Sequence, residues 1–252
     1  TSIVKSSETI NEQIKEIIET LTINSKKSTY IRDGFKPIIP ENTKIIDLKL
    51  DNEILTINFS KEFLTVNETN EEPMLEALIY SLTELKEIKK IKILVENIPF
   101  TKLPNSNKKL PEYLDKTYGI NKIYNLNSLK ETSKTTIYYL SKINDYYYYV
   151  PVTKVSNEKL ERVEIIIKEL KSTPIYHTNL ISYLKASANM TNYELLENAI
   201  SLSFNNYLIA NMKEEQILEE VKYSIALSLR DTYGINEVIF NIPDSENSKI
   251  SI

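Results

Sequence analysis

The chain has 252 residues, of which 41% are hydrophobic and 26% are charged, a composition typical of a folded globular protein. Its formal net charge is −4, and it contains no cysteine, which excludes disulfides and cysteine-based metal sites. No apolar run reaches the roughly 20 residues that span a bilayer. Because the chain begins with Thr1 rather than Met, we expect the native chain to be longer and to carry any targeting segment outside this sequence.

The first half of the chain predicts a helix, two strands, a second helix and a further strand. The second of the two strands has the core LTINF at 55–59, where Leu55, Ile57 and Phe59 alternate with the outward-facing Thr56 and Asn58. An amphipathic helix follows over residues 74–85. The segment IKILVENIP, at 91–99, is apolar on both faces and predicts a central strand.

The second half of the chain predicts the same elements, preceded by a strand pair. That pair spans 135–154, with a turn at Asn144 and Asp145. A helix is expected after an Asn157 cap, and strands are expected over 191–198 and 199–204. A helix over 217–229 and a strand over 236–243 complete the set. In the first half, residues 2–5 match the end of the strand pair, so we expect the first strand of that pair to lie before Thr1.

An internal repeat underlies this order. The pentapeptide TYGIN occurs at 117–121 and 232–236, but aligning its two copies brings no further similarity. A shift near 145 residues instead aligns four segments in one order: 17–21 with 166–170, 55–59 with 200–204, 75–82 with 218–225, and 97–99 with 241–243. A period this long indicates a duplicated domain rather than a solenoid. We therefore predict an α+β fold in tandem, with the helices of each copy on one face of a small, mainly antiparallel sheet.

The distribution of charge along the sequence predicts the boundary between the two copies. Residues 1–99 and 137–252 each have a net charge of −4, whereas residues 100–136 have a net charge of +4. We expect a first domain over 1–99 without its N-terminal strand, a basic linker over 100–136 and a second domain over 137–252. Two acidic bodies are poorly suited to nucleic acid, so we expect no nucleic-acid partner. The basic segment is interpreted as a solvated linker, with docking on an acidic partner as the alternative.

No residue pattern indicates catalysis. His177 is the only histidine, and it lies in STPIYHTN, a loop-like stretch without a nucleophile elbow. Three glycines cannot form a phosphate-binding loop, and no carboxylate pair stands out. We therefore expect no enzyme activity and no catalytic, cofactor or metal residues. An enzyme of unrecognised chemistry, which would need a deep pocket with converging polar groups, remains the alternative.

The candidate interaction residues are tyrosines. The run at 146–149 leads into Val150 and Val152, so strand alternation places Tyr146 and Tyr148 toward the core and Tyr147 and Tyr149 outward. Ordinary strand tyrosines are the first interpretation. Outward tyrosines are also suited to contacts with protein or sugar, which are the two alternatives.

The order of motifs resembles the GerM domain, and its duplication resembles the tandem GerM-domain proteins of spore-forming Firmicutes. The matching segments are a Tyr-rich strand, VPVTK, a helix, strands ending in Phe (INFSKEFL and LSFNNYL), helices with LIYSLTEL or VKYSIALSL, and closing LVENIP or IFNIP strands. The resemblance covers most of the chain apart from the linker and the two ends. It implies ring-building-motif-like domains and a non-enzymatic, extracytoplasmic assembly protein of sporulation and spore germination.

Further expectations about the whole protein follow from this resemblance. It implies localisation in the Firmicute sporangium and membrane attachment through a lipid anchor outside this chain. It also implies envelope or sporulation-complex proteins as partners, within a complex between mother cell and forespore. The alternative is a general cell-envelope lipoprotein that binds peptidoglycan or another wall glycan. The chain departs from the family pattern because it lacks a lipobox cysteine.

Overall fold

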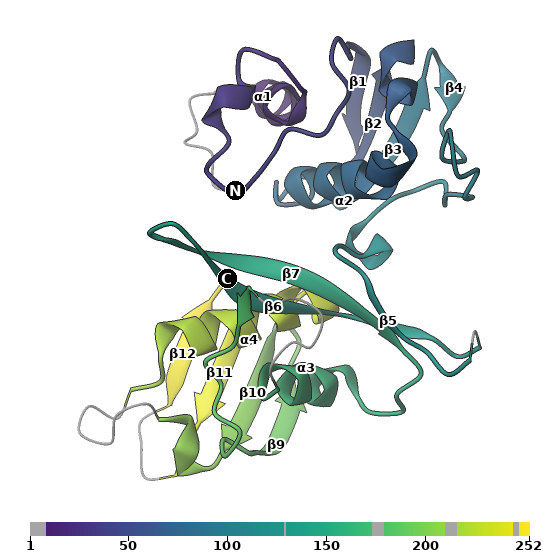
Figure 1. The fold of residues 1–252 in the computed structure, drawn as a ribbon. Helices are drawn as coiled ribbons and strands as arrows, with labels where there is room; N and C mark the ends of the chain where they lie inside the picture. Colours follow the sequence, from purple (N-terminus) through teal and green to yellow (C-terminus); the bar gives the residue numbers. More distant parts are fainter. Residues whose placement is uncertain (1–8, 129, 173–178, 210–215, 244–246) are drawn as a thin grey trace. The chain divides into compact units, whose positions relative to one another are not determined.

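The structure, a computed structural model, describes residues 9–128, 130–172, 179–209, 216–243 and 247–252 (Figure 1). Its internal contacts divide the chain into two compact units, Thr1–Ile120 and Asn121–Ile252. Each unit has its own hydrophobic core.

The first unit packs two helices against a four-stranded sheet of order β1-β2-β3-β4. Strands β2 and β3 are parallel, whereas the outer pairs are antiparallel. Its elements are α1 (Ile10–Leu21), η1 (Ser28–Tyr30), β1 (Ile45–Asp51), β2 (Ile54–Phe59), η2 (Lys61–Thr65), η3 (Glu68–Asn70), α2 (Glu71–Leu82), β3 (Lys90–Val95), β4 (Ile98–Pro99) and η4 (Lys116–Tyr118).

Local sequence explains the main elements of this unit. Helix α1 begins at a capping box, in which the Thr9 hydroxyl accepts from the Glu12 backbone N–H and the Glu12 carboxylate accepts from the Thr9 N–H. In β2, Leu55, Ile57 and Phe59 are fully buried, as the alternation predicts. The predicted outward Asn58 is also buried, at 4% exposure. The turn between β3 and β4 covers it, where Asn97 exchanges two hydrogen bonds with its side chain, of 2.8 and 3.0 Å.

The expected basic linker over 100–136 is not a separate segment in the structure. Its first part belongs to the first unit, because Leu103, Leu114 and Tyr118 are buried in that unit's core. Leu114 and Ile91 also exchange backbone hydrogen bonds of 2.8 Å. The part after Ile120 belongs to the second unit. The prediction was wrong because it was based on net charge alone. Apolar residues between the lysines pack into the core of the first unit, and net charge does not report them.

The second unit has two four-stranded sheets, of order β12-β11-β10-β9 and β5-β7-β6-β8. Helices α3 and α4 lie between the long β6–β7 hairpin and the β9–β12 sheet, and residues from all of these elements form one core (Figure 1). The elements are β5 (Ile123–Asn125), β6 (Ser133–Ile143), β7 (Tyr146–Ser156), α3 (Arg162–Leu170), β8 (Leu180–Ile181), β9 (Met190–Leu195), β10 (Ala199–Phe204), η5 (Asn206–Leu208), α4 (Glu219–Tyr233), β11 (Glu237–Asn241) and β12 (Ser248–Ser251).

The predicted duplication is confirmed by the order and pairing of these elements. The order α1-β1-β2-α2-β3 recurs as α3-β9-β10-α4-β11, and the parallel pair β2/β3 recurs as β10/β11. The two TYGIN segments both follow a helical turn but differ in the conformation of their glycines. Gly234 ends α4 in the left-handed region, with φ 71° and ψ 24°, whereas Gly119 follows η4 with φ 86° and ψ 166°. The predicted strand remnant at 2–5 lies outside the described residues.

The start of α3 differs from the prediction. The helix begins at Arg162, after a capping box formed by Glu161 and Glu164, and not directly after Asn157. The Asn157 side chain instead holds the preceding loop, because it accepts from the Asn127 N–H at 3.1 Å and donates to the Lys130 carbonyl at 2.6 Å. Asparagine is common at helix caps and in turns, but here the side chain of Asn157 stabilises a loop.

Candidate interaction surface

The described residues offer little for catalysis. They contain no group of three or more His, Asp or Glu side chains that could hold a metal ion. His177 lies outside the part of the chain that the structure describes. Among the same described residues, no helix is both long and apolar enough to cross a bilayer.

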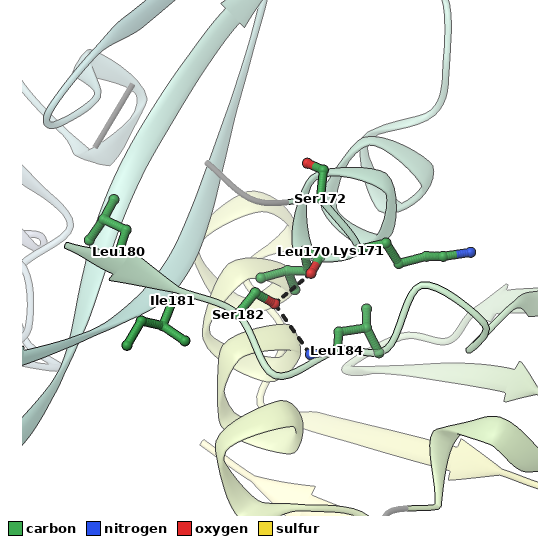
Figure 2. Close-up of a pocket in the computed structure, with 7 residues that line it drawn as sticks. All are labelled: Leu170, Lys171, Ser172, Leu180, Ile181, Ser182 and Leu184. Atoms are coloured by element: carbon green, nitrogen blue, oxygen red, sulfur yellow. Dashed lines mark hydrogen bonds between the residues drawn. The ribbon is translucent and has the colours of Figure 1, made fainter. Parts of the chain in front are cut away.

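One hollow, of about 330 Å³, lies between the end of α3 and β8 (Figure 2). It is lined by Leu170, Lys171, Ser172, Leu180, Ile181, Ser182 and Leu184. The serine hydroxyl groups that line the hollow form hydrogen bonds with backbone atoms of the chain itself. Ser182 donates to the Leu170 carbonyl and accepts from the Leu184 N–H, and Ser172 donates to the Glu169 carbonyl. The lining residues therefore present neither an acid–base pair nor a nucleophile with a base beside it.

The tyrosine-rich hairpin is a more informative feature. Strands β6 and β7 pair in continuous register from Ser133↔Ser156 to Ile143↔Tyr146. The predicted turn at Asn144 and Asp145 joins them, and Asn144 adopts the left-handed region with φ 53°. This register fixes which side each tyrosine of β7 faces.

The hairpin places the four tyrosines of the run differently. Tyr147 is 51% exposed, as the alternation predicts. Tyr149 was expected to be exposed but is half-buried, because its ring packs 5.9 Å from the ring of Tyr223 in α4. Tyr146 was expected to face the core but is 57% exposed, because it adjoins the turn, where the hairpin extends beyond the core. Tyr148 is half-buried, as a core-facing position allows.

Two further tyrosines extend the surface around Tyr147 and Tyr149. Tyr183, which follows β8, is 40% exposed, and a hydrogen bond with Tyr147 raises its pKa. Tyr223 is 37% exposed. We call Tyr147, Tyr149, Tyr183 and Tyr223 the tyrosine surface. Sequence reasoning missed Tyr183 and Tyr223, because loop and helix positions meet the hairpin only in the folded unit.

Acidic residues of α4 border the tyrosine surface. Glu219 and Glu220 lie one helical turn before Tyr223. Burial, followed by the charges of Glu220 and Glu219 and the neighbouring Tyr223, raises the pKa of Tyr149 to about 12, so its phenol stays neutral at physiological pH. On the opposite side, the Lys142 ammonium lies 5.7 Å from the centre of the Tyr147 ring. The surface therefore combines exposed aromatic area with an acidic border.

Comparison with known proteins shows what the two units are similar to. Residues 1–101 match the family described as Germane: Sporulation and spore germination. Over 230 residues, 89% of this chain, the sequence is 26% identical to the spore germination protein GerM of Bacillus subtilis (strain 168). The fold matches the tandem GerMN domains of the B. subtilis sporulation protein GerM with a TM-score of 0.85 and 23% identity, over 96% of this chain and 84% of that one.

The chain is therefore similar to tandem GerM domains over most of its length, and we call its two units the first and second GerM domains after this similarity. The family match covers the first GerM domain, and the structural match extends over the second. The chain corresponds to 63% of the length of B. subtilis GerM. The tyrosine surface belongs to the second GerM domain.

Proposed function

We propose that this tandem GerM-domain chain is a non-enzymatic assembly protein of sporulation and spore germination. Similarity to the spore germination protein GerM supports the biological setting. The observation that carries the proposal is the tyrosine surface, which places exposed tyrosines from a strand, a loop and a helix side by side. Tyrosine is enriched at protein interfaces because its ring is large and rigid and its hydroxyl accepts and donates hydrogen bonds.

In this proposal the partners are other envelope or sporulation-complex proteins, within a complex between mother cell and forespore. The protein is extracytoplasmic and is attached to the membrane through a lipid anchor outside this chain. The two acidic GerM domains supply rigid surfaces for assembly. They carry no chemistry of their own.

Affinity capture after crosslinking, from growing and from sporulating cells of the native organism, tests the proposal. Capture of defined envelope proteins during sporulation alone is the expected result. The same partners in both growth states would contradict a sporulation role.

The exposed tyrosines also favour a second candidate, which is binding of peptidoglycan or another wall glycan, because sugar rings stack on aromatic faces. Co-sedimentation with purified peptidoglycan separates the two candidates. Sedimentation that is lost in Tyr147→Ser and retained in Tyr124→Ser would favour the glycan. Tyr124 is a suitable control because it is 56% exposed but lies on β5, outside the tyrosine surface.

A further inference from the structure

A recurring arrangement in the first GerM domain shows how this chain combines tyrosine, glutamate and lysine. Three lysines each form an ion pair with a glutamate and also lie over a tyrosine ring. Their distances to the ring centres are 5.5, 6.0 and 5.7 Å. The three sets are Lys92 with Glu112 and Tyr113, Lys108 with Glu72 and Tyr118, and Lys116 with Glu84 and Tyr80.

One of these sets occupies the position that the tyrosine surface occupies in the second GerM domain. The internal repeat aligns 75–82 with 218–225, which makes Tyr80 the counterpart of Tyr223. Tyr80 is 8% exposed, its hydroxyl donates to the Lys116 carbonyl at 3.2 Å, and the Lys116 ammonium lies over its ring. In the first domain, the chain itself thus supplies the cation at this position.

In the second GerM domain, no lysine among the described residues lies over the ring of Tyr223. The alignment places Leu227 where the first domain has Glu84, and the acidic residues nearest to Tyr223 along the helix are Glu219 and Glu220, one turn before it. Tyr223 is 37% exposed and lies beside Tyr149 rather than under a lysine. Glu219 pairs with Lys222, whereas Glu220 makes no ion pair within the described residues. Lys142 lies over Tyr147, at the other side of the surface. Burial of Tyr149 and the hydrogen bond of Tyr183 with Tyr147 are the largest causes of their raised pKa values, and the charge of Glu220 raises the pKa of both. Glu220 also precedes Tyr223 by one helical turn, so this carboxylate, without an ion pair in the described part of the chain, borders the tyrosine surface.

We propose that the tyrosine surface of the second GerM domain binds a lysine or arginine side chain of a partner protein. Glu220 would accept hydrogen bonds from the ammonium or guanidinium group, and the faces of Tyr183 and Tyr223 would cover it by cation–π contact. The partner's cation would take the place over Tyr223 that Lys116 takes over Tyr80 in the first domain. The inference rests on the proposed assembly function and adds the chemistry of the contact.

Charge complementarity favours a basic protein segment over a glycan or an anionic lipid surface. A neutral sugar would leave the charge of Glu220 without a counterion, and an anionic headgroup would be repelled by it. A single exposed cation–π contact contributes only about 0.5–1 kcal/mol. The interaction therefore depends on the carboxylate and several rings acting together on one cation.

The test is selection of a random-peptide display library on the immobilised chain. Wild type is compared with Glu220→Gln and Tyr223→Ser, and with Glu194→Gln, which removes an exposed carboxylate on β9 in the other sheet. We expect several-fold enrichment of Lys and Arg on wild type and on Glu194→Gln. That enrichment should be lost on Glu220→Gln and Tyr223→Ser and should fall with added salt. Cooperative thermal unfolding establishes that the variants are folded, and only Tyr223→Ser is expected to have a lower midpoint, because its ring packs against Tyr149.

Other outcomes overturn the inference. Absence of Lys and Arg enrichment on wild type would contradict it, as would enrichment that survives Glu220→Gln or preferential recovery of acidic peptides. Binding of purified peptidoglycan that depends on Glu220 and Tyr223 would assign the surface to a glycan instead. The capture experiment in sporulating cells is independent of this selection. A failure of the cation contact is therefore distinguishable from a failure of the assembly function.

Discussion

The ring of Tyr149, in β7, lies 5.9 Å from the ring of Tyr223, in α4, with an interplanar angle of 48°. This contact joins the hairpin to the helix that carries the acidic border. Tyr149 and Tyr147 therefore have different roles. Tyr149 contributes to packing within the domain, whereas Tyr147 remains exposed to solvent.

The two tyrosines should therefore respond differently to substitution. Tyr149→Ser is expected to lower the free energy of unfolding of the second GerM domain by about 1–2 kcal/mol, through lost aromatic packing. Tyr147→Ser should change it by less than about 0.5 kcal/mol, as is usual at exposed sites. Urea denaturation of the two single variants measures the difference. Equal losses would contradict the assignment of Tyr149 to packing.

Glu71 fastens a loop of the first GerM domain onto the start of α2. It is 1% exposed and accepts hydrogen bonds from the backbone of Asn105 and Ser106 and from the Asn105 side chain. Glu71→Ala should cost about 1–3 kcal/mol, because three part-buried hydrogen bonds to a charged acceptor are lost. The exposed Glu68→Gln serves as the control and should cost little. Chemical denaturation at neutral pH measures both, and a loss near zero for Glu71→Ala would show that the loop is held by other contacts.

The same carboxylate predicts a pH dependence. Burial alone would raise the pKa of Glu71, but the hydrogen bonds from Asn105 and Ser106 outweigh it and hold the pKa below its ordinary value of 4.5. The stabilisation is therefore fully present above that ordinary value and is lost as the pH falls through the lower folded-state pKa. Glu71→Gln should reduce stability at neutral pH and flatten this acid-side decline. A decline as steep as that of the wild type would contradict the role of Glu71.

Lys154 is buried in the second GerM domain, at 7% exposure, between Glu158 and Glu169. Burial acts to lower the pKa of Lys154, but the hydrogen bonds with both carboxylates reverse the shift and raise it. Glu169→Gln should destabilise the domain by about 2 kcal/mol, because the lysine keeps only one ionised partner. Glu197→Gln, in the exposed β9–β10 turn, is the matched control. If both variants unfold at the same denaturant concentration, the buried pairing contributes nothing measurable.

Gly234 ends α4 in the left-handed region, with no atom within 4 Å of the position that a Cβ would take. The expected cost of Gly234→Ala is therefore conformational rather than steric, about 1 kcal/mol. Gly234→Asn should cost less, because asparagine tolerates this region. Thermal unfolding of the two variants measures the order. A larger loss for asparagine than for alanine would contradict this account.

Much of the fold was predictable from local pattern. Leu55, Ile57 and Phe59 alternate along β2, and their counterparts in β10 recur in the same order, so the repeat revealed both domains. The order of the repeated segments was informative because each one reports its own helix or strand.

Features that depend on tertiary contact were not predictable. The burial of Asn58 depends on a turn distant in sequence, and the half-burial of Tyr149 depends on a helix that strand alternation cannot place. The basic segment was interpreted from its charge, although Leu103 and Leu114 tie its first part into a core. The aligned pair Tyr80 and Tyr223 was visible in the repeat, but the lysine over one of them was not.

The central claim is that this chain acts in sporulation through the tyrosine surface. The most direct test is the yield of heat-resistant spores after the native gene is replaced by Glu220→Gln, by Tyr223→Ser, by Glu194→Gln or by a deletion. The account predicts that the deletion and the first two variants lower the yield to a similar extent, while Glu194→Gln sporulates normally, with equal protein levels for all variants. A normal yield for the deletion would contradict the sporulation role. A lowered yield for the deletion with a normal yield for Glu220→Gln and Tyr223→Ser would contradict the role of the tyrosine surface.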